Sequence, residues 1–403
     1  MHILVLQETD WITRGPHIQH HIFENLSKNL SIRVTVIDYD IDKTQRSKSV
    51  INKKRIFYQI HRTIKDSNIK IIRTFHIQVP FLRRITSLIS NFFEILKIIR
   101  KNRPDIIIGY SVTNGFVGIL LAKLFKISFV FHYIDILHEL IPFNHIQNIA
   151  RIIARFMLKH AEQVLTMTKL HQKFVINEGV NPQKVKILPT GVSLENTLVD
   201  NKKFEKLKSK LSISNDDFVI FFMGYMYEFA GLKEIIDYYN TDVKTGKLNL
   251  KFIILGDFGI YNFLVNYVKE IRANWVVIQR RVPYFEIPEY IQLADLCLLS
   301  FKINNITREI IPQKIFEYMA MKKPVLSTCL PGVFLEIGQN NGVIFVKNQK
   351  ELITKIGESI SYKMELEAIG QDGFKFIKQK YTWSKIIKNF KAIIFDLIRR
   401  KSS

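Results

Sequence analysis

Two glutamates, Glu309 and Glu317, have the spacing that most directly suggests chemistry in this chain, and Pro312 and Lys314 lie between them. A helix that begins between the glutamates directs its free backbone N–H groups and the positive end of its dipole toward an anion. Lys314 adds a point charge, and carboxylates accept hydrogen bonds from hydroxyl groups. The pattern therefore suits a phosphorylated sugar. The alternative interpretation is a helix that carries two solvated glutamates.

Helical periodicity places these side chains. Pro312 is expected at the first helical position, because its missing N–H would have no partner there, and apolar residues follow it at helical spacing. Glu309 then lies in the loop before the helix and Glu317 lies inside the helix. The β-like run PVLST at residues 324–328 follows after a turn.

A second set of polar residues follows the first expected strand. His17, His20, His21 and Glu24 are spaced i, i+3, i+4 and i+7, so they share one face of a helix. Three interpretations are open for them: a metal site, the substrate-facing start of a helix, or ordinary polar surface.

Two loops hold further candidates for contact with a ligand. Arg14 and Gly15 precede the helix that carries the histidines, where a glycine allows the backbone to approach a phosphate closely. A plain strand-to-helix turn is the alternative. His132, Asp135 and His138 lie at the end of a core strand. A His–Asp pair there could orient or deprotonate a hydroxyl group, whereas Asp135 could instead cap a helix.

Strands and helices alternate through the first half of the chain. We expect strands at 2–7, 33–39, 69–75, 105–111, 127–133, 163–168 and 185–189, and helices near 17–30, 81–101, 114–125, 146–159 and 169–178. Strands separated by helices predict a parallel, doubly wound sheet, whose ligands bind at the carboxyl ends of the strands. The loops after residues 7, 111 and 133 are therefore the expected walls of a site.

A second cycle of strands and helices follows a turn-rich segment at 189–202, and a chain of 403 residues is long enough for two cores. The expected fold class is α/β, with two doubly wound domains that face a cleft. We expect an N-terminal domain at 1–192, a linker at 193–212 and a C-terminal domain at 213–384. The terminal helix, 385–403, is expected to pack back on the first domain.

The net charge of +23 is concentrated, because residues 43–103 hold sixteen Lys and Arg against two acids. Such a stretch attracts nucleic acid, phosphorylated substrates or an acidic lipid surface. Nucleic acid ranks last, because the sequence has no aromatic-basic RNA-binding signature, zinc finger or helix-turn-helix pattern. The expected helix at 81–101 has a broad apolar face with cations opposite. That face lies either in an anionic membrane interface or against the sheet.

The expected location is the cytoplasm, at the inner face of the cell membrane. No run reaches the ~18–20 apolar residues of a membrane span, and the chain begins with a strand rather than an export signal. Cys297 and Cys329 occur in apolar strands, as expected of two buried thiols in a reducing compartment. Charge would hold the protein to an anionic membrane surface.

The chain resembles retaining glycosyltransferase family 4, which has the GT-B fold, nearly from end to end. The stretch EIIPQKIFEYMAMKKPVLST (309–328) resembles the family's Glu-x7-Glu donor-sugar motif in its Pro-x-Lys form. Two further stretches resemble the donor domain of the family: FVIFFMGYMYEFAGLKEII and FIILGDFG. The end of its acceptor domain is similar to KVKILPTGVSLE. A prokaryotic branch of the family has loops similar to DWITRGPHIQHHIFENLS and FHYIDILHELIP.

The resemblance implies two Rossmann-like domains, with a nucleotide-diphosphate-sugar donor in the C-terminal domain and a lipid-linked or surface-glycan acceptor in the N-terminal one. It implies no cofactor and no metal. Glu317 would hold the ribose hydroxyls and Glu309 would contact the sugar. The diphosphate and sugar would meet Gly224 and Lys314 together with the backbone at Ile310, Ile311, Pro312 and Gln313.

On the acceptor side, the resemblance places Asp135 and His138 beside the reacting centre. It assigns phosphate or acceptor contacts to Arg14, Gly15 and His17. It also implies front-face displacement, in which the departing phosphate helps to take the acceptor proton.

The chain departs from the family at Tyr225 and Ala230, where many members carry Arg and Lys. The leaving-group charge would then fall to Lys314, the helix amides and Arg14. Two other functions stay open: a nucleotide-sugar epimerase of the same fold, and a basic nucleic-acid-binding protein.

Overall fold

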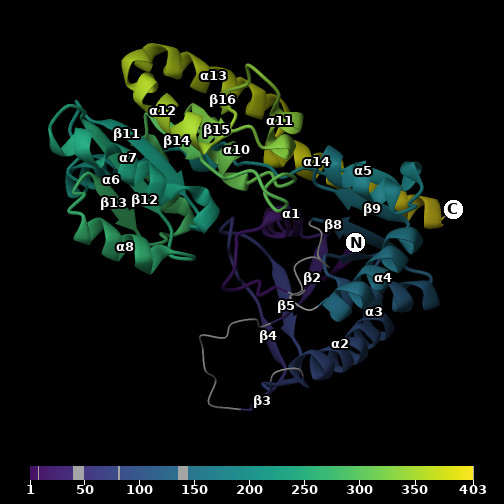
Figure 1. Cartoon of the computed structure of the whole chain (residues 1–403). Helices are drawn as coiled ribbons and strands as arrows, with labels where there is room; N and C mark the ends of the chain where they lie inside the picture. Colours follow the sequence, from purple (N-terminus) through teal and green to yellow (C-terminus); the bar gives the residue numbers. More distant parts are fainter. Residues whose placement is uncertain (8, 40–49, 80–81, 135–143, 403) are drawn as a thin grey trace. The chain divides into compact units, whose positions relative to one another are not determined.

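The computed structural model describes residues 1–7, 9–39, 50–79, 82–134 and 144–402, and it divides the chain into two compact units. Unit 1 contains residues 1–190 and 383–403, and unit 2 contains residues 191–382 (Figure 1). The terminal helix α14 (Trp383–Ser402) therefore belongs to unit 1.

Unit 1 is built on an eight-stranded sheet with the order β10-β9-β8-β7-β1-β2-β5-β4, in which only the edge strand β4 is antiparallel to its neighbour. Its strands are β1 (His2–Leu6), β2 (Arg33–Asp38), β4 (Arg55–Phe57), β5 (Ile69–Arg73), β7 (Ile106–Gly109), β8 (Ser128–Tyr133), β9 (Gln163–Thr166) and β10 (Val185–Ile187). A short antiparallel pair, β3 (Ile51–Asn52) and β6 (His76–Ile77), lies apart from this sheet.

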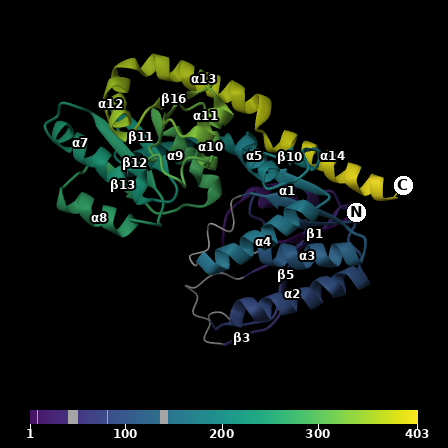
Figure 2. The same ribbon diagram turned by 45° about the vertical axis from the view of Figure 1, so that its right-hand side comes forward.

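Alternate residues of β1 face two separate cores, as the pleat of a strand requires. Leu4 and Leu6 pack under α2 (Leu82–Lys101), α3 (Val112–Leu124), α4 (Asn144–His160) and α5 (Lys169–Asn177). Ile3 and Val5 pack under α1 (Ile18–Ser27) and α14. Figures 1 and 2 show α2, α3 and α4 side by side along one face.

Unit 2 contains a six-stranded, fully parallel sheet with the order β13-β12-β11-β14-β15-β16. The strands are β11 (Phe218–Met223), β12 (Leu250–Leu255), β13 (Val276–Gln279), β14 (Leu296–Leu299), β15 (Val325–Thr328) and β16 (Val343–Val346). The helices are α6 (Asn201–Lys210), α7 (Leu232–Lys244), α8 (Tyr261–Glu270), α9 (Ile287–Gln292), α10 (Gln313–Ala320), α11 (Pro331–Ile337), α12 (Gln349–Ser359) and α13 (Lys363–Lys380).

Each sheet has one point where the strand order reverses. In unit 1 the chain adds strands to one side of β1 and then returns to add β7 on the other. In unit 2 the same reversal separates β11 from β14. Doubly wound sheets bind ligands outside the carboxyl ends of the strands at such switch points. The two candidate sites therefore lie at the loops after β1 and β7 and at the loops after β11 and β14.

The α/β class and the two doubly wound sheets are confirmed, and several details differ from the prediction. Pro312 precedes α10 as its N-cap, with ψ of 130°, so the helix begins at Gln313. The segment predicted as a linker contains the helix α6, and α11 was not predicted. Cys297 is buried, but Cys329 is only partly buried.

The helix α2 does not bury the broad apolar face predicted for it. The side chains that it buries are Ser87, Asn91, Ile95 and Ile99. Those that it exposes include Leu82, Ile85, Ile89, Phe92 and Phe93. We call these five residues the α2 apolar stripe. Within the described residues, every helix is too short or too polar to span a membrane.

Candidate functional site

Lys314 occupies the switch point of unit 2. It is the second residue of α10 and is 9% exposed. Its Nζ donates a hydrogen bond to the carbonyl oxygen of Met223 over 2.8 Å. The same nitrogen lies 3.7 Å from the ring centroid of Phe222 and 4.6 Å from that of Phe301. Burial lowers the pKa of Lys314 to about 7. The structure thus puts a desolvated amine between the ends of β11 and β14.

Gly224 follows β11 directly and lies beside Lys314, so the structure brings these two predicted residues together. A Cβ on Gly224 would lie 3.6 Å from Lys314 Nζ, and the φ of Gly224 is +114°, which favours glycine. The next loop packs against its carbonyl, because a Cβ on Gly256 would lie 2.2 Å from Gly224 O. Both glycines are therefore needed where the two loops meet.

The first turn of α10 presents backbone N–H groups at the same place. Gln313 and Lys314 open the helix, and its N-cap, Pro312, makes no side-chain capping bond. The first N–H groups of a helix have no partner within the helix. Ile310 and Ile311 precede it and are partly buried against the core of unit 2. The helix start can therefore accept an anion beside the Lys314 amine.

Glu317 lies one turn beyond Lys314 and lines a small cavity. The other lining residues are Val192, Ser193, Thr197, Tyr284, Ile287, Pro288, Ile291 and Met321. Burial raises the pKa of Glu317 to about 7, although the positive charge of Lys314 opposes that shift. No residue that the structure describes donates a hydrogen bond to this carboxylate. Glu317 is therefore a hydrogen-bond acceptor available to a ligand.

Glu309 lies in the loop before α10, as predicted, and its backbone is held by Gly332 of α11. The N–H of Gly332 donates to Arg308 O over 2.8 Å, and a Cβ on Gly332 would lie 2.9 Å from Glu309 O. The carboxylate of Glu309 has no hydrogen bond or ion pair among the described residues. The structure thus fixes the backbone of this residue and assigns its side chain no partner.

Aromatic rings surround Tyr225, in the loop after β11. Tyr225 stacks on Phe258 and on Tyr227, with ring centroids 5.6 and 4.2 Å apart. The guanidinium of Arg281 lies 4.9 Å from the Phe258 ring centroid. Ala230 is fully buried. Neither Tyr225 nor Ala230 adds positive charge, so Lys314 is the cation that lies at the switch point.

The loop after β1 in unit 1 is held by a buried ionic cluster that the sequence did not reveal. Arg73 lies 2.6 Å from Asp10 and 2.8 Å from Asp38. The carboxylate of Asp38 also accepts the N–H of Trp11. Arg73 is 63 residues from Asp10 in the chain, and no spacing rule links such distant positions.

Arg14, Gly15 and His17 lie in this same loop. Gly15 has a φ of +89°, and a Cβ there would lie 2.9 Å from the ring of His20. The guanidinium of Arg62 donates to Gly15 O over 3.3 Å. The side chains of Arg14 and His17 are exposed.

Of the three interpretations left open for the polar residues of α1, ordinary surface does not hold for His20, His21 and Glu24, because all three are buried. His20 accepts the N–H of His17 and donates to Trp11 O, and burial lowers its pKa to about 3. His21 stacks on Trp383, with centroids 4.3 Å apart. The Glu24 carboxylate accepts backbone N–H groups at residues 62–64. Within the described part of the chain, no group of three His, Cys, Asp or Glu side chains could hold a metal.

Asp135 and His138 lie outside the described residues. Their neighbour His132 is fully buried at the end of β8, where its Nδ1 hydrogen-bonds the hydroxyl of Tyr110 over 2.9 Å. Burial lowers the pKa of His132 to about 3. His132 is therefore a neutral core residue.

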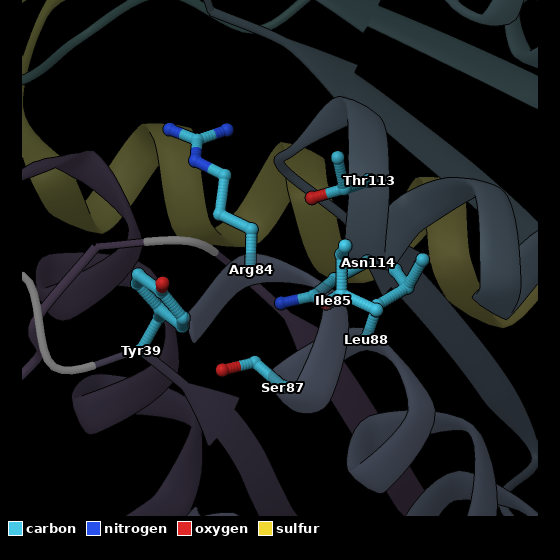
Figure 3. Close-up of a pocket in the computed structure, with 7 residues that line it drawn as sticks. All are labelled: Tyr39, Arg84, Ile85, Ser87, Leu88, Thr113 and Asn114. Carbon is cyan, nitrogen blue, oxygen red and sulfur yellow. The ribbon is translucent and has the colours of Figure 1, made fainter. Parts of the chain in front are cut away.

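A further cavity, of about 210 Å³, lies near the switch point of unit 1 (Figure 3). Tyr39 follows β2 directly, and the other lining residues belong to α2 and α3: Arg84, Ile85, Ser87, Leu88, Thr113 and Asn114. Asn114 donates to Gln7 O over 2.8 Å, which ties the first turn of α3 to the end of β1. Thr113 and Asn114 follow residue 111, where the sequence predicted a wall of a site, but Tyr39 and the residues of α2 were not predicted as site residues, because no periodic pattern relates the three segments.

Comparison with known proteins gives two family matches. Residues 24–196 match the model of Glycosyltransferase Family 4, and residues 217–361 match that of Glycosyl transferases group 1. An uncharacterized glycosyltransferase of Methanocaldococcus jannaschii is 22% identical over 62% of this chain and 62% of its own length. The UDP-Gal:alpha-D-GlcNAc-diphosphoundecaprenol alpha-1,3-galactosyltransferase of Escherichia coli is 22% identical over 78% and 80%, respectively.

Among solved structures, Anabaena HepE in complex with UDP is similar, with a TM-score of 0.74 and 16% sequence identity. The match covers 98% of this chain and 100% of that one. This likeness shows the fold, two Rossmann-like domains of the GT-B type. Together with the two family matches and the relatives, it identifies the chain as a GT-B glycosyltransferase, and the match over residues 24–196 is consistent with glycosyltransferase family 4.

Proposed function

We propose that this glycosyltransferase moves a hexosyl group from a nucleotide-diphosphate-sugar donor to a lipid-linked or surface-glycan acceptor, with retention of anomeric configuration. The single observation that carries the proposal is the group of Lys314, Gly224 and the first turn of α10 at the switch point of unit 2. A buried amine beside free helix amides suits a diphosphate.

On this proposal, Glu317 accepts hydrogen bonds from the ribose hydroxyls of the donor. Lys314 and the α10 amides then stabilise the negative charge that develops on the diphosphate as its bond to the sugar breaks. Glu309, Ile310 and Ile311 lie in the loop just before that turn and would contact the sugar. The HepE structure contains UDP, which supports a nucleoside diphosphate as the ligand class.

The acceptor would bind in unit 1. Asp135 and His138 would lie beside its reacting hydroxyl, and Arg14, Gly15 and His17 would contact the phosphate or the acceptor. The departing phosphate would take the acceptor proton in a front-face displacement. The E. coli relative is named for a diphosphoundecaprenol-linked acceptor, which supports a lipid-linked substrate.

We also propose that the protein associates peripherally with an anionic membrane surface at the cytoplasmic side. The α2 apolar stripe is exposed, with Phe93 at 62% and Ile89 at 53%. Residues 43–103 supply the positive charge. An amphipathic helix with cations nearby binds an interface through both effects.

Donor binding is tested by a thermal-shift panel of nucleoside diphosphates and their sugars. A ligand at ~100 times its Kd adds about 2.7 kcal/mol to the free energy of unfolding, so one nucleotide should raise Tm by several degrees. Glu317→Ala should abolish that rise. The matched control, Glu358→Ala, removes an exposed carboxylate of α12 and should retain it. A panel without any shift, or an unchanged shift in Glu317→Ala, would contradict the proposal.

Membrane association is tested by liposome flotation at low salt, with and without anionic lipid. The protein should float with the vesicles only when they contain anionic lipid, and less of it should float in the Ile89→Asp variant. The control Ile303→Asp places the same charge at an isoleucine of unit 2 that is 44% exposed, and its recovery should be unchanged. Equal recovery with neutral and anionic vesicles would sink this part of the proposal.

A further inference from the structure

The cavity of Figure 3 has the features of an anion site. The first turn of α3 lines it through Thr113 and Asn114, and Ser111, the N-cap of that helix, makes no side-chain capping bond. The first turn of α3 contains no acidic residue. Its backbone N–H groups and the positive end of the helix dipole are therefore available to an anion.

A buried hydroxyl provides an independent observation at the same place. Ser87 lines the cavity from α2 and is 3% exposed, yet no described residue hydrogen-bonds its Oγ. Buried polar atoms in native proteins nearly always have partners. The neighbouring polar groups have theirs, because Asn114 is held between Gln7 O and the amide of Asn91. The Ser87 hydroxyl is thus left for a ligand.

Two arginines of α2 make the cavity electropositive. Arg84 lines it, its side chain is exposed, and it has no described partner. Figure 3 shows the Arg84 guanidinium on the same side of the cavity as the Thr113 hydroxyl. The Arg83 guanidinium lies 4.9 Å from the ring centroid of Tyr39. None of the described lining residues is acidic, so the charge is not neutralised locally.

The cavity also continues into an apolar surface. Ile85 and Leu88 line it, and Ile85 is itself part of the α2 apolar stripe, with Leu82 and Ile89 next to it on the helix. Residues three and four apart on a helix are surface neighbours, so the stripe leads away from the cavity. A ligand that fits both features carries a phosphate joined to a hydrocarbon chain.

We propose that this cavity binds the phosphate of a lipid-linked acceptor, with its hydrocarbon chain along the α2 apolar stripe. Arg84, Ser87 and the first-turn amides of α3 bind the phosphate oxygens, and Ile85 and Ile89 contact the chain. The inference rests on the proposed function for the identity of the acceptor. It adds the chemical class of the group that is bound and the residues that bind it.

Calorimetric titration of the full chain with two soluble probes tests the inference. Inorganic pyrophosphate represents the anion alone, and geranyl diphosphate adds a short hydrocarbon chain. Arg84→Gln should lower the affinity for both probes about tenfold, because it removes a charged hydrogen-bond donor. Ile89→Ser should lower the affinity for geranyl diphosphate several-fold, because a partly buried aliphatic side chain no longer contacts the hydrocarbon chain. The affinity for pyrophosphate should be unchanged. Arg100→Gln, the same charge loss at an exposed position near the other end of α2, should change neither.

The outcomes distinguish a lipid-linked phosphate from a free phosphate compound. They also distinguish failure of this inference from failure of the donor proposal. Equal affinity for both probes would overturn the lipid-linked assignment in favour of a free phosphate compound. If Arg84→Gln leaves the affinity for both probes unchanged, the probes bind at another site, such as the one at Lys314, and the cavity assignment is overturned. If Arg84-dependent binding of geranyl diphosphate persists while no nucleotide binds, the donor proposal has failed and this inference stands.

Discussion

Lys314 shows how a single residue can link the fold to the proposed chemistry. Its amine directly contacts a carbonyl oxygen and two aromatic rings, and Glu317, one turn away, is the carboxyl group whose charge opposes the lowering of its pKa. Burying a charge in this way costs folding free energy, and such perturbed groups concentrate at functional sites. A diphosphate bound at the switch point of unit 2 would offset that cost, because it would place negative charge beside the amine.

The buried amine predicts a pH dependence of stability. Its folded pKa is about 7, whereas the ordinary pKa of a lysine is 10.5, so the unfolded state binds more protons between these values. The free energy of unfolding of the wild type should therefore rise relative to Lys314→Met from pH 7 to 9.5. A gain on the order of 2 kcal/mol is expected. Urea unfolding of both proteins at the two pH values measures it.

In the wild type, Glu317 has a raised pKa of about 7 and contributes mainly below that pH, whereas Lys314→Met removes the positive charge that opposes the shift, so Glu317 then lowers the stability of the variant above pH 7 and adds to the expected difference. Burial disfavours its carboxylate, so its effect has the opposite sign: stability falls as pH rises from 4.5 to 7. A wild-type minus Lys314→Met difference that stays flat from pH 7 to 9.5 would show that the amine is not desolvated.

At the scale of elements, α10 depends on α11 for the position of its leading loop. The sequence predicted α10 from helical periodicity and a proline. It could not predict the role of Gly332, because that role is a contact between backbones, which leaves no periodic signal. Gly332 lets the chain at Arg308 and Glu309 approach within hydrogen-bond distance of α11.

Gly332→Ala should therefore weaken nucleotide binding while unit 2 stays folded. The new Cβ would lie 2.9 Å from Glu309 O and 3.0 Å from its carbonyl carbon, so the loop must shift. Losing one good hydrogen bond to the diphosphate corresponds to about a tenfold rise in Kd. Calorimetry with the nucleotide found in the thermal-shift panel measures this.

Val333→Ala is the matched control for this variant, because Val333 is buried in the same helix. It leaves a cavity in the core and should lower stability by about 1–3 kcal/mol without moving the loop. If both variants weaken nucleotide binding equally, the loop contact has no specific role.

At the scale of the whole molecule, local patterns predicted the architecture. Runs such as 3–6 and 218–223 are apolar throughout, as buried parallel strands require, and helical stretches separate them. The order of the strands, and with it the two switch points, follows from the rules for doubly wound sheets.

The sequence failed where distant segments meet. The ionic cluster of Arg73, Asp10 and Asp38 joins three segments, and the cavity at Tyr39 and Ser87 joins others. The same limit explains the histidines of α1. Their spacing was visible, but their burial under α14 depended on a helix more than 350 residues away. Such contacts depend on packing between elements, which spacing along one element does not encode.

The most direct test of the central claim, that the switch point of unit 2 holds the donor diphosphate, compares two ligands that differ by one phosphate. Calorimetry should show that the wild type binds the nucleoside diphosphate at least about tenfold more tightly than the monophosphate. Lys314→Met should lose that preference. Lys323→Met should keep it, because Lys323 lies just before β15, at the opposite ends of the strands, where it donates to Gln292 O. Equal preference in Lys314→Met and the wild type would contradict the account.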